Sequence, residues 1–212
     1  MEIQGRIIKT GSSGNCVIFD NRIAIDCGIP YKDIEPYKKS LQVIFYTHVS
    51  HSDHYNKSTL RLLQFERPAL RVGCSGHDSE ILKANGVKNI DVLNIGQLYD
   101  YASFKVCPIK MYHDVPCIGF RLFINGKKIF FATDTFTLEG IVAKNYDEYY
   151  CECNYDKDRI MDIIKEKRDN GQFCHQLGSV NSHLSIQQAQ NFVLQNAGKD
   201  YEFIRLHQSK EF

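Results

Sequence analysis

The sequence lacks long hydrophobic runs, and it lacks an excess of charge of either sign. No uninterrupted apolar stretch exceeds four residues, far short of the roughly 18 that a membrane-spanning helix needs. The formal net charge is +1, so no global basic field marks the chain as a nucleic-acid binder, although a local basic patch is compatible with it. The first residues lack the apolar core of a signal peptide. We therefore expect a cytoplasmic protein that is not associated with a membrane.

The composition excludes a disordered tail and a coiled coil. Hydrophobic residues make up 43% of the chain and charged residues 24%, which is the balance of a folded globular protein. At about 150 residues per domain, a chain of 212 residues predicts a single domain spanning 1–212. Because no export signal accompanies them, we expect the eight cysteines to be thiols rather than a disulfide framework.

Short β-type runs alternate with helical patterns along the chain. The predicted strands are residues 3–8, 16–20, 23–26, 43–46, 70–74, 103–107, 118–124, 128–132 and 202–206. The predicted helices are a short one after Tyr31, one capped near Asn56, and residues 78–84, 158–167 and 186–195. Asn125-Gly126 is a strong signal for a hairpin turn. This order favours a layered α/β sandwich over a doubly wound sheet.

Residues 47–54 contain the densest group of potential metal-binding side chains. This segment places His48, His51, Asp53 and His54 within seven residues, after a predicted buried strand and before a predicted helix. A loop that follows a strand can aim several side chains at one point, and imidazole and carboxylate groups are ligands that divalent metals such as Zn²⁺ prefer. The pattern favours a metal site over the alternative of a histidine-rich surface loop.

A second set of candidate ligands is distributed over the rest of the chain. The remaining histidines are His77, His113, His175, His183 and His207. Asp134 follows a predicted apolar strand, where an aspartate is well placed to bridge two cations. Taken singly, His113, His183 and His207 fit structural roles. Together with the 47–54 segment and Asp134, they provide a set of ligands for two metal ions.

Four other patterns have two interpretations each. The loop at residues 11–15 is a phosphate cradle or a tight turn, and Ser13 and Asn15 are its candidate substrate-binding residues. Cys151 and Cys153, together with Cys174-His175, are small core residues or a structural zinc site. The basic run Lys165, Lys167 and Arg168 is a solvated helix face or a contact for a nucleic-acid backbone, and His77 begins a helix or lies at the rim of a pocket.

Taken in order, these motifs resemble the metallo-β-lactamase superfamily, and within it the YycJ/WalJ-like branch, which is related to the RNase Z-like phosphodiesterases. The matching segments are residues 11–16, 25–28, 47–54, 113–114, 133–135, 152–156, 183–185 and 206–209. The resemblance implies a four-layer αββα sandwich of the α/β class. It also implies two divalent metal ions, for which the ligand types suit zinc, manganese or iron.

The resemblance also implies a role for individual residues. His48, His51 and His113 would bind the first ion, Asp53, His54 and His207 the second, and Asp134 would bridge them. Asp26 would support the metal-binding loop through hydrogen bonds. His183 would steady the phosphate and protonate the leaving group, so that Asp53 and His183 are the candidate catalytic residues.

One departure from the family pattern concerns His48. The family has one residue between the first two histidines of this motif, whereas Val49 and Ser50 both stand between His48 and His51 here. Either the loop bulges and keeps His48 on the metal, or that ligand is lost; we favour the bulge.

The function expected from the resemblance is hydrolysis of phosphodiester bonds, with a DNA exonuclease-like nuclease as the first candidate. The near-zero net charge argues mildly against a long duplex substrate, because extended phosphate contacts need clustered lysine and arginine. A cyclic-nucleotide phosphodiesterase is the alternative, and a metal-binding protein whose catalysis has decayed is a distant third. The expected partners are a nucleic acid or nucleotide substrate, and a homodimer is compatible with so short a chain.

Overall fold

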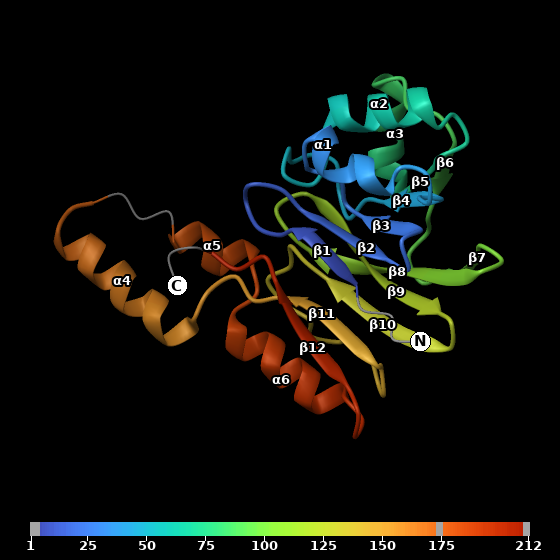
Figure 1. The fold of residues 1–212 in the computed structure, drawn as a ribbon. Helices are drawn as coiled ribbons and strands as arrows, with labels where there is room; N and C mark the ends of the chain where they lie inside the picture. The colour runs from blue at the N-terminus through green and yellow to red at the C-terminus, as the bar shows by residue number, and fades with distance from the viewer. Residues whose placement is uncertain (1–4, 173–175, 210–212) are drawn as a thin grey trace. The chain divides into compact units, whose positions relative to one another are not determined.

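The structure, a computed structural model, describes residues 5–172 and 176–209. The chain forms two compact units, Met1–Gln97 and Leu98–Phe212, which are coloured blue to green and green to red in Figure 1. The single domain expected from the chain length stays a prediction. Among the described residues, no helix combines the length and the apolar character needed to span a membrane.

The first unit is built on a six-stranded sheet whose strands follow one another in sequence order. Its strands are β1 (Arg6–Lys9), β2 (Cys16–Phe19), β3 (Ile23–Ile25), β4 (Val43–Phe45), β5 (Arg71–Cys74) and β6 (Ile90–Val92). β1, β2 and β3 are antiparallel, whereas β3, β4, β5 and β6 are parallel. Parallel neighbours require crossover connections, and the helices of this unit supply them.

The crossover helices pack on one face of this sheet. They are α1 (Tyr31–Ile34), the 3-10 helix η1 (Glu35–Tyr37), α2 (Lys57–Glu66) and α3 (Gly76–Ala84). Ala24, Ile44 and Val72 lie opposite one another on adjacent strands, and they share a buried cluster with Leu63 of α2 and Leu82 of α3. The Asn56 cap is confirmed, because its side chain accepts a hydrogen bond from the Thr59 amide.

The second unit contains the other six-stranded sheet, in the order β12-β11-β10-β9-β8-β7. Its strands are β7 (Tyr99–Asp100), β8 (Phe104–Tyr112), β9 (Pro116–Ile124), β10 (Lys127–Ala132), β11 (Glu148–Glu152) and β12 (Glu202–Leu206). The hairpin between β9 and β10 is confirmed: Asn125 and Gly126 both have positive φ, at 49° and 82°, as a type I′ turn requires.

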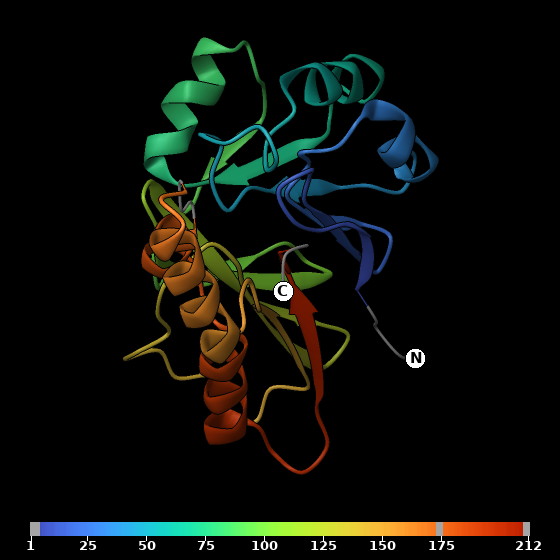
Figure 2. The ribbon, with the colours of Figure 1, turned by 90° about the vertical axis from the view of Figure 1, so that its left-hand side faces the viewer.

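Three helices belong to the second unit: α4 (Lys157–Asp169), α5 (Gln176–Ser182) and α6 (Ile186–Asn196). α6 begins at a capping box formed by Ser185 and Gln188, and it lies against β11 (Figure 1, Figure 2). Its Phe192 ring lies 5.0 Å from the ring of Phe130 on β10. This contact belongs to a core that also includes Tyr149 of β11.

Both sheets gather the ends of several strands at one edge. In the first unit the carboxyl ends of β3, β4 and β5 meet, because these strands are parallel. In the second unit β10, β11 and β12 are parallel, and β8 runs in the same direction because β9 is antiparallel to both β8 and β10. Ligands of open α/β sheets bind beyond such carboxyl ends, and the candidate ligands lie there in both units.

Candidate functional site

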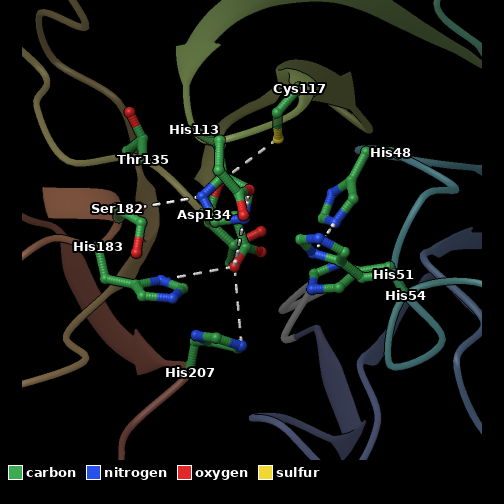
Figure 3. A network of polar contacts seen from close by, with 12 residues as sticks. His48, His51, His54, His113, Cys117, Asp134, Thr135, Ser182, His183 and His207 are labelled. Atoms are coloured by element: carbon green, nitrogen blue, oxygen red, sulfur yellow. Dashed lines mark hydrogen bonds and ion pairs between the residues drawn. The ribbon is translucent and has the colours of Figure 1, made fainter. Parts of the chain in front are cut away.

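The first group of candidate ligands, which we call the loop cluster, consists of His48, His51, Asp53 and His54. They lie in the connection between β4 and the Asn56 cap of α2. Figure 3 shows the imidazoles of His48, His51 and His54 converging from this loop. The segment forms here because β4 ends at Phe45 and α2 begins at Lys57, which leaves a connection long enough to turn several side chains toward one point.

Asp26, which follows β3, fixes the orientation of His54. Its Oδ2 lies 2.8 Å from His54 Nδ1, and its carboxylate also accepts hydrogen bonds from the amide and hydroxyl of Thr47. Burial raises the pKa of Asp26, and the charge and hydrogen bond of His54 oppose that shift. When Nδ1–H donates to a carboxylate, the lone pair of Nε2 becomes available to a metal. Asp26 therefore lies where the resemblance expects a supporting residue.

The extra residue in the motif does not carry His48 away from its neighbours. His48 is fully buried, and its Nε2 lies 3.2 Å from His51 Nδ1. Two nitrogens bound tetrahedrally to one zinc ion at about 2.0–2.1 Å lie about 3.3 Å apart, so the observed spacing suits a shared ion. Asp78 of α3 holds the inserted segment, because its Oδ1 accepts a hydrogen bond from the Val49 amide at 3.2 Å.

Asn15 holds the other side of the loop cluster. Its side-chain oxygen accepts a hydrogen bond from the Gly11 amide, and its Nδ2 lies 2.9 Å from His54 Nε2 and 3.3 Å from Asp53 Oδ2. Asn15 is buried, whereas Ser13 is exposed. The structure thus gives Asn15 a positioning role toward two candidate ligands, and substrate contact by either residue stays a prediction.

The second group, which we call the strand-end cluster, consists of His113, Asp134, Glu152, His183 and His207. Asp134 lies at its centre: Oδ1 is 4.0 Å from His113 Nε2, 3.6 Å from His183 Nδ1 and 3.7 Å from His207 Nε2. Figure 3 shows these imidazoles disposed around the carboxylate. Four of the five residues lie at or just beyond the ends of β8, β10, β11 and β12, and His183 follows α5.

Glu152 is the functional candidate that the sequence interpretation missed. Its carboxylate is fully buried; Oε1 lies 2.5 Å from His183 Nδ1 and 3.0 Å from His207 Nδ1. Oε2 accepts hydrogen bonds from the amides of Thr135 and Leu184. Although burial alone would raise it, the pKa of Glu152 is lowered because the two histidines stabilise the charged form. The residue lies in a matched motif, but no role was assigned to it.

The contact between Glu152 and His183 shifts the pKa of His183 in the opposite direction. Burial would lower the pKa of its imidazole, but the hydrogen bond and charge of Glu152 outweigh burial, and the pKa of His183 is raised. Its side chain is 19% exposed, compared with 3% for His113 and 6% for His207. His183 is therefore the most accessible imidazole of the cluster and the one held toward its protonated form.

His113 is oriented by the backbone of the segment that precedes His183. Its Nδ1–H donates to the Ser182 carbonyl oxygen at 3.0 Å, which directs Nε2 toward Asp134 and, at 3.0 Å, toward Asp114. Asn154, which follows β11, donates from Nδ2 to the carbonyl oxygen of His207 at 3.2 Å. Outer contacts of this kind fix the tautomer and the direction of metal-binding histidines.

Three site residues adopt the left-handed backbone region just beyond a strand. Asp26, Asp134 and His207 have φ values of 58°, 53° and 51°. This region is uncommon for residues other than glycine, with asparagine, aspartate and histidine enriched among the exceptions, and such conformations concentrate at functional sites. Each turn redirects a side chain at the sheet edge into its cluster.

The donor sets of both clusters fit divalent metal ions. Within the strand-end cluster, one ligand atom each from Asp134, Glu152, His183 and His207 lies within 4.8 Å of the others. Neutral imidazole nitrogens with carboxylate oxygens, and without thiolates, suit zinc, manganese or iron.

The remaining sequence candidates lie elsewhere. Cys151 and Cys153 are buried in the core of the second unit, which fits small core residues; Cys174 and His175, the other members of the alternative zinc site, lie outside the described residues. His77 is exposed in the first turn of α3, and Lys165–Arg168 lie on α4.

Comparisons with known proteins place the fold. No family model matches the sequence, and no curated protein matches it either. Among solved structures, the metallo-β-lactamase fold protein YhfI from Bacillus subtilis aligns over 98% of this chain and 87% of its own, with 17% identity and a TM-score of 0.75. The short form of human tRNase Z aligns over 98% of this chain and 93% of its own, with 16% identity and a TM-score of 0.68.

A diphosphatase of the PhnP family covers 98% of this chain and 87% of its own, with 15% identity and a TM-score of 0.67. Similarity to solved structures at such low sequence identity establishes the fold only. The activity has to be inferred from the site. The resemblance to the YycJ/WalJ-like branch stays an expectation from the sequence. The fold prediction is confirmed: this chain has the α/β fold of the metallo-β-lactamases.

Proposed function

We propose that this protein is a metal-dependent hydrolase that cleaves phosphodiester bonds and acts on nucleic acid. The observation that carries the proposal is the environment of Asp134, a buried carboxylate within 4.0 Å of imidazole nitrogens from His113, His183 and His207. Buried charges are retained where they are paired or bind metals, and a carboxylate among imidazoles is a typical donor set for a divalent cation.

The proposed ligands are those that the resemblance implies. They are His48, His51 and His113 for one ion, Asp53, His54 and His207 for a second, and Asp134 as the bridge. Bound cations of this kind lower the pKa of water toward about 7 and neutralise the charge that develops on phosphate. Asp26 and Glu152 hold the Nδ1 atoms of His54 and His207, so that the Nε2 atoms of these histidines are the ones that would bind metal.

His183 is the proposed proton donor. Its Nδ1–H is held by Glu152, so Nε2 is the atom that would carry the proton for a departing oxygen. The raised pKa of His183 favours the protonated imidazole, which is the form that a general acid needs before it acts. We therefore assign His183 to protonation of the leaving group.

The similar folds support a phosphate-containing substrate without choosing one. One of them is a tRNase and another is a diphosphatase. Among the substrates open to this site, a DNA exonuclease-like activity is the one we propose. Cytoplasmic location and a homodimeric state also stay predictions from the sequence.

The test is one assay panel with added Mn²⁺ or Zn²⁺ at about pH 7.5, near the pKa of metal-bound water. It compares labelled duplex DNA, single-stranded DNA, RNA and 3′,5′-cyclic nucleotides. Asp134→Asn removes the central charge while keeping the side-chain size, and Glu139→Gln is the matched control because Glu139 is exposed. Progressive shortening of DNA by the wild type and the control, but not by Asp134→Asn, is the expected result.

Two other outcomes would replace the proposal. Opening of cyclic nucleotides with intact polymers would make the protein a cyclic-nucleotide phosphodiesterase. A chain that binds metal yet leaves every substrate intact, including the activated diester bis(p-nitrophenyl) phosphate, would be a metal-binding protein without this catalysis.

A further inference from the structure

The first unit has a hollow that none of the loop-cluster residues lines. It has a volume of about 480 Å³ and lies between α2 and the turn that follows α3. Helices α2 and α3 lie on the same side of the first sheet (Figure 1). Tyr55, which directly follows His54, lines it. The volume falls within the range of about 300–1,000 Å³ typical of small-ligand pockets.

Hydrogen bonds at both ends hold the hollow open. Gln64 of α2 donates to the Lys88 carbonyl oxygen at 2.7 Å and accepts from the Lys88 amide at 3.0 Å. At the other end, Lys57 Nζ donates to Asn85 Oδ1 at 2.7 Å. The turn is therefore tied to α2 on both sides, and the hollow is preformed rather than made by ligand binding.

The lining is cationic and aromatic. Lys57, Arg61 and Lys88 line the hollow, and none of the described residues that line it is acidic. The side chains of Arg61 and Lys88 form no hydrogen bond or ion pair with any described residue. Phe65 is 83% exposed at the same place, so its ring is available to stack on a ligand.

One polar group inside the hollow lacks a partner. Tyr55 is only 8% exposed, and its hydroxyl forms no hydrogen bond with any described residue. Burial raises the pKa of Tyr55 and the amide of the adjacent Asn85 opposes the shift, but the two groups do not complete a hydrogen bond. A buried tyrosine hydroxyl usually has a partner; this one is closed to solvent, so a ligand in the hollow would bond it only after the Tyr55 or Asn85 side chain turns.

We propose that this hollow holds one nucleotide of a single-stranded nucleic acid. Phe65 would stack on the base, the Tyr55 hydroxyl would bond its polar edge, and Arg61 and Lys88 would contact the flanking phosphates. Exposed aromatic rings beside basic side chains are the means by which proteins bind single strands without sequence preference. That the strand is also the substrate rests on the proposed function.

The test exploits the absence of tryptophan from the chain. Phe65→Trp introduces a single fluorescent reporter at the stacking position. The probe is a short single-stranded oligonucleotide with phosphorothioate linkages, which resist hydrolysis. We expect the oligonucleotide to quench the tryptophan fluorescence on titration. In the same background, Arg61→Ala with Lys88→Ala should weaken binding about tenfold and reduce the slope of log K against log salt by about 1.4, as for two lost phosphate contacts on a single strand.

Two controls make the result specific. Lys32→Ala with Lys39→Ala removes the same charge from exposed positions outside the hollow and should leave binding within about twofold. Tyr55→Phe removes only the hydroxyl and should weaken binding severalfold. Absence of quenching, or equal binding of poly-glutamate, would overturn the proposal, because the second result would show attraction of any polyanion.

Hydrolysis of bis(p-nitrophenyl) phosphate, measured on the same variants, separates this proposal from the proposed function. Its rate should not change in the hollow variants, because this small diester needs no strand contact. Quenching without any hydrolysis would leave the nucleotide site standing and refute the hydrolase. Hydrolysis without quenching would refute the nucleotide site alone.

Discussion

Glu152 holds His183 through an Oε1–Nδ1 contact of 2.5 Å, and the same oxygen lies 3.0 Å from His207 Nδ1. One carboxylate thus orients two imidazoles that have different proposed tasks, proton donation for His183 and metal binding for His207. We expect Glu152→Gln to lower both metal affinity and phosphodiester turnover by about 10–100-fold, as is typical for outer partners of ligand histidines. Metal titration and turnover of bis(p-nitrophenyl) phosphate measure the two effects.

Glu139→Gln is the control for that substitution, since Glu139 is exposed. Wild-type turnover and metal affinity in Glu152→Gln would show that the buried carboxylate does not act through the histidines.

Asp26 makes an analogous contact in the first unit, to His54 Nδ1 at 2.8 Å. In Asp26→Asn the side chain keeps its size but loses the charge that selects the His54 tautomer. We expect metal affinity to fall about 10–100-fold, measured by competition with a chelating dye. Asp33→Asn on α1 is the control in the same unit. Equal metal affinity in both variants would contradict the support assigned to Asp26.

Gly28 allows the closest backbone approach in the loop cluster. A Cβ at this position would lie 1.9 Å from the carbonyl oxygen of Asp53, so Gly28→Ala must displace the backbone between Asp53 and His54. Overpacking of this kind costs about 1–3 kcal/mol or more. We expect a loss of about 3 kcal/mol in the free energy of unfolding, measured by urea denaturation, together with a loss of bound metal.

Gly178→Ala provides the contrast for Gly28→Ala. Gly178 lies in α5, and a Cβ there meets nothing within 4 Å. Because alanine is a better helix former than glycine, we expect a gain of up to about 1 kcal/mol. Similar effects of the two substitutions would mean that the close approach at Gly28 does not matter.

Glu148 gives a prediction about pH that does not involve the site. Burial raises the pKa of Glu148; Tyr150 and Lys127 oppose this shift, and Glu202 adds to it. The folded chain therefore binds this proton more tightly than the unfolded chain does. The resulting stabilisation is complete below the ordinary glutamate pKa of about 4.3 and is lost as the pH rises through the raised pKa.

Glu148→Gln removes this titration. The stability of the variant relative to the wild type should therefore increase as the pH rises above the ordinary glutamate pKa of about 4.3. Urea unfolding at a series of pH values measures it, and a difference that does not change with pH would refute the assignment.

Local signals allowed much of the fold to be predicted. Asn56 identified the start of α2 and Asn125-Gly126 the hairpin between β9 and β10, because caps and tight turns depend on a few adjacent residues. β11 was missed, since its buried ends are the charged Glu148 and Glu152, which interrupt the apolar pattern on which strand prediction relies.

The candidate site was predicted unevenly for a related reason. His48, His51 and His54 are close in sequence, so their proximity could be inferred. Glu152 contacts His183 and His207 only because β11 lies between β10 and β12, and strand order is a long-range property that a single sequence does not display. The support of Val49 by Asp78 likewise depends on the placement of α3 beside the loop.

The left-handed backbone at Asp134 has a consequence for protein engineering. Glycine adopts φ near 53° without steric cost, and it would also remove a buried charge. Asp134→Gly would thus relieve the unfavourable backbone conformation while deleting the proposed bridging ligand. A library screened for thermostability alone would accumulate inactive chains at this position, so any selection for a hardier protein has to be coupled to an assay of turnover.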